Sequence, residues 1–266
     1  MVRRKKRREK EEKRGCWFSR RRRRWPWILL ILAVAIIFIS IAAYLSQKPG
    51  EVAPPKRAVI LDGLSMDYPN QTFIRSAEKI LKQAGFTVDV YGLENITLSL
   101  LRKLPSEDYG LVIFRIHGGR MRPPIGIFID GVLFIERCSP GSHMEEIESG
   151  YLLLGRTFLS NQTYCVVPPH YITDKLHGRF RGAIIIAMSC FTGDYELMAK
   201  AFFKRGAGAY IGFRGKISPA YADAFTINLL RKIYVENIPL QEAFNQVRGE
   251  LGPDPDYKGT PVLYLP

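Results

Sequence analysis

Beyond residue 56, apolar and polar residues form blocks that predict strands and helices in turn. RAVILDG (57–63) predicts a short buried strand, and the block from Asn70 to Gly85 has apolar residues at helical spacing and a terminating glycine. FTVDVYG (86–92) alternates and predicts a strand near a sheet edge, whereas ITLSLLRKLP (96–105) predicts a short helix ended by proline. YGLVIFRI (109–116) is almost wholly apolar, as strands buried on both faces of a parallel sheet are.

The alternation returns after residue 180. The predicted elements there are the strand RGAIIIAMSC (181–190), a helix over 195–204, the strand GAYIGF (208–213), helices over 219–236 and 240–251, and a last short strand, PVLYL. Strands that alternate with helices favour an α/β fold with a parallel sheet and right-handed crossovers. Residues 57–266 can bury one large core.

Residues 121–180 have a different pattern, which predicts a β-rich insertion beside the main sheet. GIFIDGVLFIE (126–136) places two β-prone runs around Asp130-Gly131, a dipeptide that favours a two-residue hairpin turn. YLLLGRTFLSNQTYCVVPP (151–169) also predicts strands.

The N-terminal region predicts a membrane anchor. WILLILAVAIIFISIAAYL (27–45) carries no charge, and at about 1.5 Å per helical residue it is long enough to cross a hydrocarbon core of roughly 30 Å. A secretory signal peptide is the alternative, although its apolar segment normally has only about 7–15 residues. The predicted organisation is a basic head (1–26), a transmembrane helix (27–45), a linker (46–56) and a folded domain (57–266).

Charge is concentrated in the head. Residues 1–24 hold fourteen Lys or Arg and three Glu, so +11 of the formal net charge of +14 lies there. The positive-inside rule then predicts a single-pass protein of the cell membrane, with a cytoplasmic N-terminus and an extracellular C-terminal domain. Anionic lipid is the expected partner of the head, and nucleic acid is not expected as a partner. Sequons at Asn70, Asn95 and Asn161 are compatible with export.

Cysteine and histidine positions argue against a metal site. Cys16 is predicted to face the cytoplasm, while Cys138 and Cys165 could pair in an oxidising exterior and leave Cys190 alone. There is no CxxC pair, and the four histidines lack ligand-like spacing; they are His117, His143, His170 and His177. Neither a metal nor another cofactor is predicted.

Candidate chemistry lies at the ends of two predicted strands. His117 and Cys190 each follow an apolar run, and the carboxyl ends of parallel strands form the crevice in which open α/β sheets carry their sites. If the two strands are neighbours, a thiol and an imidazole meet there. This pair suits nucleophilic attack on a carbonyl, with the amides of Gly118 and Cys190 as candidate oxyanion donors.

The same residues resemble a known family. IHGG (116–119) and IAMSCFTGD (186–194) resemble the histidine and cysteine motifs of the caspase-like cysteine peptidases, and AKAFFKRGAGAYIGFRGKIS (199–218) is similar to the CHAT and gingipain members. The resemblance implies a three-layer α/β/α sandwich, with His117 as general base or acid, Cys190 as nucleophile and Gly118 as oxyanion donor. The long insertion between the motifs departs from the family pattern.

The resemblance also bears on specificity. Family members often bind a substrate side chain in a charged pocket at the end of the first strand, which here implies Asp62 and Asp194 and a preference for Arg or Lys. Arg214 and Lys216 favour the opposite charge. Alternatively, Asp62 and Asp67 cap or turn the chain before Asn70, and Asp194 caps the helix that starts at Tyr195.

Other signatures do not fit. Gly63-Leu64-Ser65-Met66-Asp67 lacks the second glycine of a nucleophile elbow. Gly206-Ala207-Gly208 precedes a strand, whereas a dinucleotide-binding loop follows one, and no GxxxxGK motif is present.

The predicted function is a membrane-anchored, outward-facing cysteine endopeptidase that acts on a peptide or protein substrate. The alternative is an inactive domain of the same fold that serves as a tethered binding module.

Overall fold

A computed structural model describes residues 29–30, 32–38, 55–121, 129–139, 141–157 and 162–266, without the side chains of residues 129 and 130. The chain divides into two units, residues 1–52 and 53–266. Residues 29, 30 and 32–38 of the first unit are helical. Within the described ranges, no helix combines the length and the apolar character needed to cross a membrane. The predicted head, span and linker fall mostly outside those ranges.

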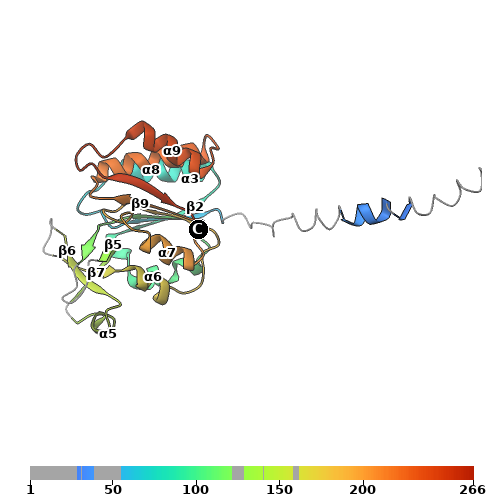
Figure 1. Cartoon of the computed structure of the whole chain (residues 1–266). Helices are drawn as coiled ribbons and strands as arrows, with labels where there is room; N and C mark the ends of the chain where they lie inside the picture. The colour runs from blue at the N-terminus through green and yellow to red at the C-terminus, as the bar shows by residue number, and fades with distance from the viewer. Residues whose placement is uncertain (1–28, 31, 39–54, 122–128, 140, 158–161) are drawn as a thin grey trace, which may run out of the picture. The chain divides into compact units, whose positions relative to one another are not determined.

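The second unit is built on a six-stranded sheet, as the alternating pattern predicts (Figure 1). Its order is β10-β9-β8-β3-β1-β2, and every neighbouring pair is parallel except β9 with β10. The predicted edge strand, β2, lies at an edge. The strands are β1 (Arg57–Asp62), β2 (Thr87–Gly92), β3 (Leu111–Arg115), β8 (Ile184–Ala187), β9 (Ala209–Arg214) and β10 (Thr260–Tyr264).

Both faces of this sheet are covered because its strands are apolar on both sides. Ala58 and Ile60 of β1 face one core, and Val59 and Leu61 face the other. One core includes α3 (Gln71–Gln83), α8 (Pro219–Tyr234) and α9 (Leu240–Leu251). The other includes α4 (Leu98–Lys103), α6 (Pro169–Lys175) and α7 (Leu197–Lys204).

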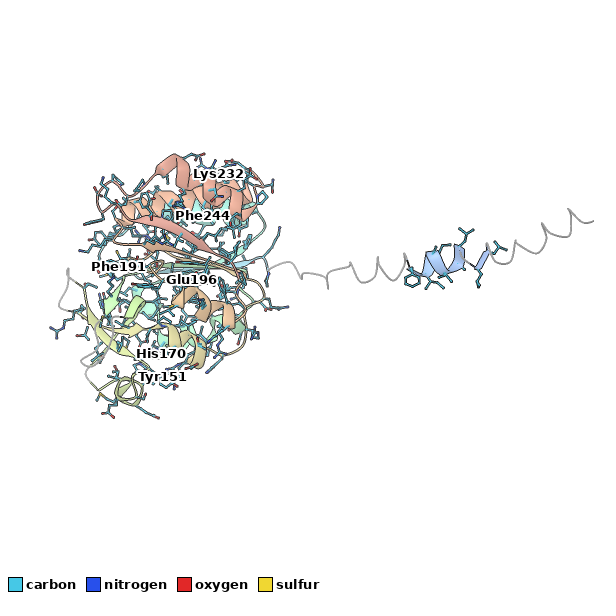
Figure 2. All side chains as sticks on the ribbon, viewed as in Figure 1. Tyr151, His170, Phe191, Glu196, Lys232 and Phe244 are labelled. Atoms are coloured by element: carbon cyan, nitrogen blue, oxygen red, sulfur yellow. A yellow bond between two sulfur atoms is a disulfide. The ribbon has the colours of Figure 1, made fainter. Side chains whose placement is uncertain are left out.

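A ring contact joins α8 to α9 in the first of these layers. Phe225 of α8 and Phe244 of α9 have ring centroids 5.7 Å apart, and Figure 2 shows Phe244 between its helix and the sheet. Short 3-10 turns, η1 (Leu93–Asn95) and η2 (Leu104–Ser106), flank α4. The result is the predicted layering of helices on both sides of a mostly parallel sheet.

The insertion forms a separate antiparallel sheet of order β4-β5-β7-β6. Its elements are β4 (Gly118–Met121), β5 (Ile129–Arg137), α5 (Met144–Glu148), β6 (Leu153–Arg156) and β7 (Thr163–Val167). The sheet begins inside the His-Gly-Gly stretch, three residues before the predicted boundary at 121.

The predicted hairpin at Asp130-Gly131 is wrong. Both residues lie within β5, where the register with β4 shifts between Gly119 and Arg120. Gly131 is the extra residue of this bulge and has φ +75°, which a residue without Cβ adopts at little cost. The Asp-Gly dipeptide therefore supplies the positive φ of a bulge instead of a turn.

Two other expectations have definite outcomes. Cys138 and Cys165, whose pairing the sequence leaves open, are joined by a disulfide across 27 positions. Asp194 does not cap the following helix, because α7 begins at Leu197 with Glu196 at its N-cap. The N-cap of α3 is Asn70, whose side chain accepts a hydrogen bond from the Phe73 N–H at 3.0 Å.

Candidate active site

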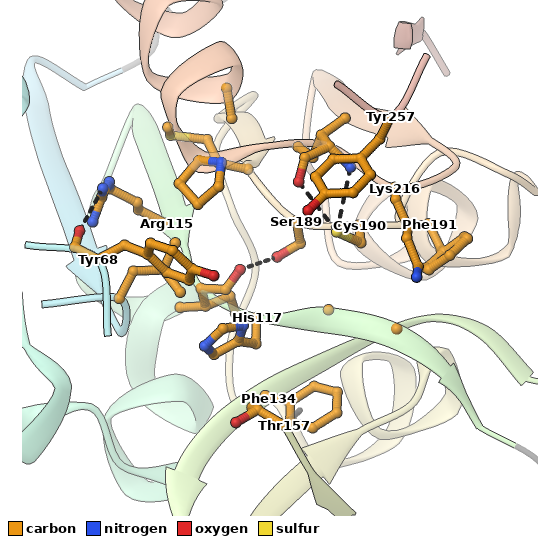
Figure 3. Close-up of a pocket in the computed structure, with 18 of the residues that line it drawn as sticks. Tyr68, Arg115, His117, Phe134, Thr157, Ser189, Cys190, Phe191, Lys216 and Tyr257 are labelled. Atoms are coloured by element: carbon orange, nitrogen blue, oxygen red, sulfur yellow. Dashed lines mark hydrogen bonds between the residues drawn. The ribbon is translucent and has the colours of Figure 1, made fainter. Parts of the chain in front are cut away.

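His117 and Cys190 lie at the same level of the main sheet. β3 and β8 are parallel neighbours, as predicted, and Phe114 pairs with Ala187 in their register. His117 and Cys190 each follow these paired positions by three residues. The register therefore brings both residues to the carboxyl ends of adjacent strands (Figure 3).

Glycine allows the two chain segments to approach closely. A Cβ on Gly118 would lie 2.7 Å from Ser189 Cβ and 2.9 Å from Cys190 O. Ser189 Oγ donates a hydrogen bond to Ile116 O at 2.7 Å. The segment that follows β3 is thus held directly against the cysteine segment.

The His117 ring is fixed on one side by a carboxylate. His117 Nε2 lies 2.8 Å from Asp67 Oδ2, so Nδ1 is the ring nitrogen left for a thiol or a substrate. Tyr68, Phe134 and Tyr164 present rings to the imidazole, with centroids 6.4, 6.5 and 6.4 Å away. These contacts define the plane and position of the ring.

Cys190 is half-buried, in surroundings that favour its neutral thiol. Its Sγ lies 3.6 Å from Ile217 O and accepts from the Ile217 N–H at 3.5 Å. Burial raises the pKa of the Cys190 thiol, and the Ile217 N–H and the charge of Lys216 oppose that shift only in part. A nucleophile in this state needs a base to remove its proton.

The backbone after the cysteine is strained. Phe191 has φ +64°, a conformation that costs a non-glycine residue about 1–3 kcal/mol. Its N–H donates to Gly215 O at 2.8 Å, and the Arg120 guanidinium lies 4.6 Å from its ring centroid. This turn lets the chain leave the strand while Cys190 stays on the pocket wall.

Gly118 presents its N–H on the open side of β4. His117 O accepts from the Phe134 N–H of β5 at 3.0 Å, and the two ends of a trans peptide point in opposite directions. The Gly118 N–H therefore points away from β5. Because β4 is a terminal strand of its sheet, this donor lies on the edge of β4 that faces away from the insertion sheet.

His117, Gly118 and Cys190 all line one pocket of about 520 Å³, which Figure 3 shows in close-up. Asp62 and Asp194, the predicted specificity residues, do not line it. Asp62 is buried and pairs with Arg115 at 2.7 Å, and Asp194 accepts from the Gly215 N–H at 2.7 Å and pairs with Arg120. Their assignment to a substrate pocket stays a prediction.

Arg115 is the centre of a buried polar cluster at the floor of the pocket. Its Nε and Nη2 donate to the two carboxylate oxygens of Asp223 at 2.8 and 2.9 Å, Nη1 donates to Asp62, and Nη2 also reaches Tyr68 O at 2.9 Å. Burial raises the pKa of Asp62, while Arg115 opposes the shift. The cluster joins β1, β3, α8 and the segment that carries Asp67.

Sequence reasoning missed three of these residues. Asp67 was interpreted only as a turn residue, and neither Arg115 nor Asp223 was singled out. A charged residue inside the otherwise apolar run YGLVIFRI was the available signal, because a buried arginine needs acidic partners.

One cluster of the described residues has donor atoms within metal-binding distance. Oxygen, nitrogen and sulfur atoms of Glu136, His143 and Cys165 lie within 4.8 Å of one another. However, the Cys165 sulfur is bonded to Cys138, and His143 Nε2 lies 2.8 Å from Glu136 Oε1. These atoms are therefore already engaged with protein groups.

Comparisons with known proteins give limited information. No protein-family model matches the chain, and no curated protein matches it. Among solved structures the chain is similar to the Arg specific cysteine proteinase gingipain R, with 13% identity and a TM-score of 0.44. The match covers 74% of this chain and 43% of that one, so the chain spans less than half the length of this neighbour. A similarity of this degree assigns no role to any residue.

Proposed function

We propose that the domain of residues 57–266 is a caspase-like cysteine endopeptidase with His117 and Cys190 as its catalytic pair. The observation that carries this proposal is that a thiol, an imidazole and a glycine backbone N–H line one pocket at the carboxyl ends of β3 and β8. Acyl transfer requires a nucleophile, a base and an oxyanion donor, and these three groups supply them.

The proposed reaction proceeds through a thioester. His117 Nδ1 takes the proton of Cys190 as the sulfur attacks the peptide carbonyl carbon, and the N–H groups of Gly118 and Cys190 stabilise the oxyanion. The imidazolium gives its proton to the leaving nitrogen as the C–N bond breaks. His117 then deprotonates a water that hydrolyses the thioester, which releases the acid and restores the thiol. Asp67 holds the Nε2 side of the ring throughout.

Alkylation of the full chain by iodoacetamide tests whether His117 activates the Cys190 thiol. We expect His117→Ala to slow modification of Cys190 by about 10²-fold, the low end of the usual effect of a general base. Mass spectrometry of the modified peptides separates Cys190 from Cys16, which serves as a reference thiol in the same sample. His170→Ala is the matched control, because its Nε2 bonds to Gly150 O outside the pocket.

Equal modification rates with and without His117 would favour the second candidate, a domain of the same fold that binds a partner without catalysis. The insertion sheet supports that alternative, because it contributes Phe134, Arg156 and Thr157 to the pocket wall.

We also propose that residues 27–45 anchor the chain in a cell membrane, with the basic head in the cytoplasm on anionic lipid and the domain outside. The uncharged sequence and the +11 head support this. The full chain should stay in membranes washed with alkaline carbonate, and Leu32→Arg/Ile36→Arg should release it. Gln47→Arg, beyond the span, is the control, and recovery of the unaltered chain in the soluble fraction would contradict the anchor.

A further inference from the structure

The carboxylates in and around the pocket are already held by hydrogen bonds within the protein. Asp223, the carboxylate among the lining residues, accepts two hydrogen bonds from Arg115 and one from Asn70 Nδ2 at 2.9 Å. Beside the pocket, Asp62 pairs with Arg115, Asp194 with Arg120 and Asp67 with His117. A substrate Arg or Lys entering here would lose water and find these carboxylates already engaged by protein groups, which is unfavourable.

Two further cations add to this exclusion. Arg156 of β6 and Lys216, on the segment after β9, both line the pocket, and Lys216 is close enough to affect the Cys190 thiol. With Arg115 and Arg120 they make four cationic side chains among the described lining residues, against the single carboxylate of Asp223. This excess of positive charge disfavours a basic substrate side chain.

The other side chains that line the pocket are largely apolar. The same space is lined by Met188, Ile217, Phe134, Tyr68 and Tyr257, the last three of which Figure 3 labels. Met188 and Ile217 are 2% and 6% exposed, so this apolar surface belongs to the packed body of the domain. A site of about 520 Å³ with such walls has room for a large side chain.

We propose that this pocket receives an uncharged, apolar side chain, aliphatic or aromatic, from the substrate residue that precedes the cleaved bond, and that it excludes arginine and lysine. This inference rests on the proposed peptidase function. It is an alternative to the basic preference implied by Asp62 and Asp194, whose carboxylates pair with Arg115 and Arg120.

The test uses three peptidyl acyloxymethyl ketones that differ only in the residue before the reactive carbonyl: Leu, Asp or Arg. We measure the second-order rate of Cys190 modification in the full chain. The Leu reagent should react at least tenfold faster than the Asp and Arg reagents. Equal rates, or a preference for Arg or Asp, would overturn the proposal. The iodoacetamide experiment with His117→Ala judges the peptidase function separately, since iodoacetamide carries no side chain.

Substitutions at Tyr257 test whether charge is the reason that the pocket excludes Arg and Lys. Tyr257 lines the pocket and is 56% exposed, so changing it does not disturb the core. Tyr257→Glu adds an unmatched carboxylate and should raise the Arg-to-Leu rate ratio at least threefold. Tyr257→Gln, of equal length and without charge, separates this gain of charge from the loss of the ring. An unchanged ratio in Tyr257→Glu would contradict the electrostatic basis of the exclusion.

Discussion

At the scale of single residues, the two ring nitrogens of His117 have different environments. Nε2 is engaged by Asp67, and aromatic rings surround the imidazole, so the ring can exchange a proton on its Nδ1 side without rotating. Asp67 acts through His117 and is therefore a positioning residue.

Asp67→Asn should slow Cys190 alkylation by less than His117→Ala does, because the ring stays in place but its protonated form loses a charged partner. We expect about tenfold at pH 7, against about 10²-fold for loss of the base. The measurement is the iodoacetamide rate across pH. A merely structural role for Asp67 would change the unfolding midpoint and leave the pH profile of the rate unmoved.

The Cys190 thiol should lose its proton at a higher pH than an ordinary thiol does. Since burial raises its pKa, the thiolate fraction at neutral pH is small and the alkylation rate should still be rising at pH values where an ordinary thiol is fully ionised. The rate of glutathione under the same conditions gives the ordinary profile, because Cys16 lies among basic residues that favour a thiolate. A Cys190 profile that levels off at a lower pH than that of glutathione would contradict the assignment of a neutral resting thiol.

Gly118→Ala should be harmful and Gly119→Ala tolerated. A Cβ at Gly118 meets Ser189 Cβ at 2.7 Å, whereas at Gly119 the nearest atom is Phe134 Cε2 at 3.5 Å, an ordinary contact. We expect a loss of about 1–3 kcal/mol in the free energy of unfolding for the first variant. Urea unfolding measures this difference, and equal midpoints for the two variants would show that the segments do not touch as described.

At the scale of elements, the sequence predicts most strands and helices but not their boundaries at the site. The apolar run 181–190 is a strand only to Ala187, because Ser189 and Cys190 turn away to contact Ile116 and Ile217. The Asp130-Gly131 hairpin fails for a similar reason. Local preference specifies a positive φ at Gly131, and strand pairing decides whether that angle serves a turn or a bulge.

Arg115 joins four of these elements, and Arg115→Met should destabilise the domain strongly. The change leaves Asp62 and Asp223 buried without a counter-charge, which costs about 3–5 kcal/mol. Adding Asp62→Asn and Asp223→Asn should recover part of that loss. Arg181→Met, which breaks an exposed pair with Asp108, is the control and should cost at most about 1 kcal/mol. Thermal unfolding midpoints that fall equally in both variants would refute the buried cluster.

At the scale of the whole domain, two sheets share one site. The main sheet supplies the His117 and Cys190 backbones, and the insertion sheet supplies Phe134 and Tyr164 against the imidazole. The disulfide joins Cys138, just after β5, to Cys165 in β7, and so holds the two strands that carry these rings.

Removing this disulfide should weaken the domain. A closed loop of 27 positions corresponds to about 3–4 kcal/mol of stabilisation through the unfolded chain. Cys138→Ser/Cys165→Ser should therefore unfold at lower urea than the unaltered chain. A phosphine reductant should shift the unaltered chain to the same midpoint and leave the variant unmoved. A reductant effect on the variant would point to a cause other than this disulfide.

The sequence by itself determined the order of elements, the α/β class and the position of a histidine and a cysteine at the ends of two apolar strands. These follow from periodicity and chain order, which are local properties. Tertiary structure alone decided which carboxylates serve which cations. Asp67 reaches His117 across 50 positions, and Asp223 reaches Arg115 across 108. Such pairings depend on the paths of intervening segments, and they fix both the orientation of the imidazole and the charge of the pocket.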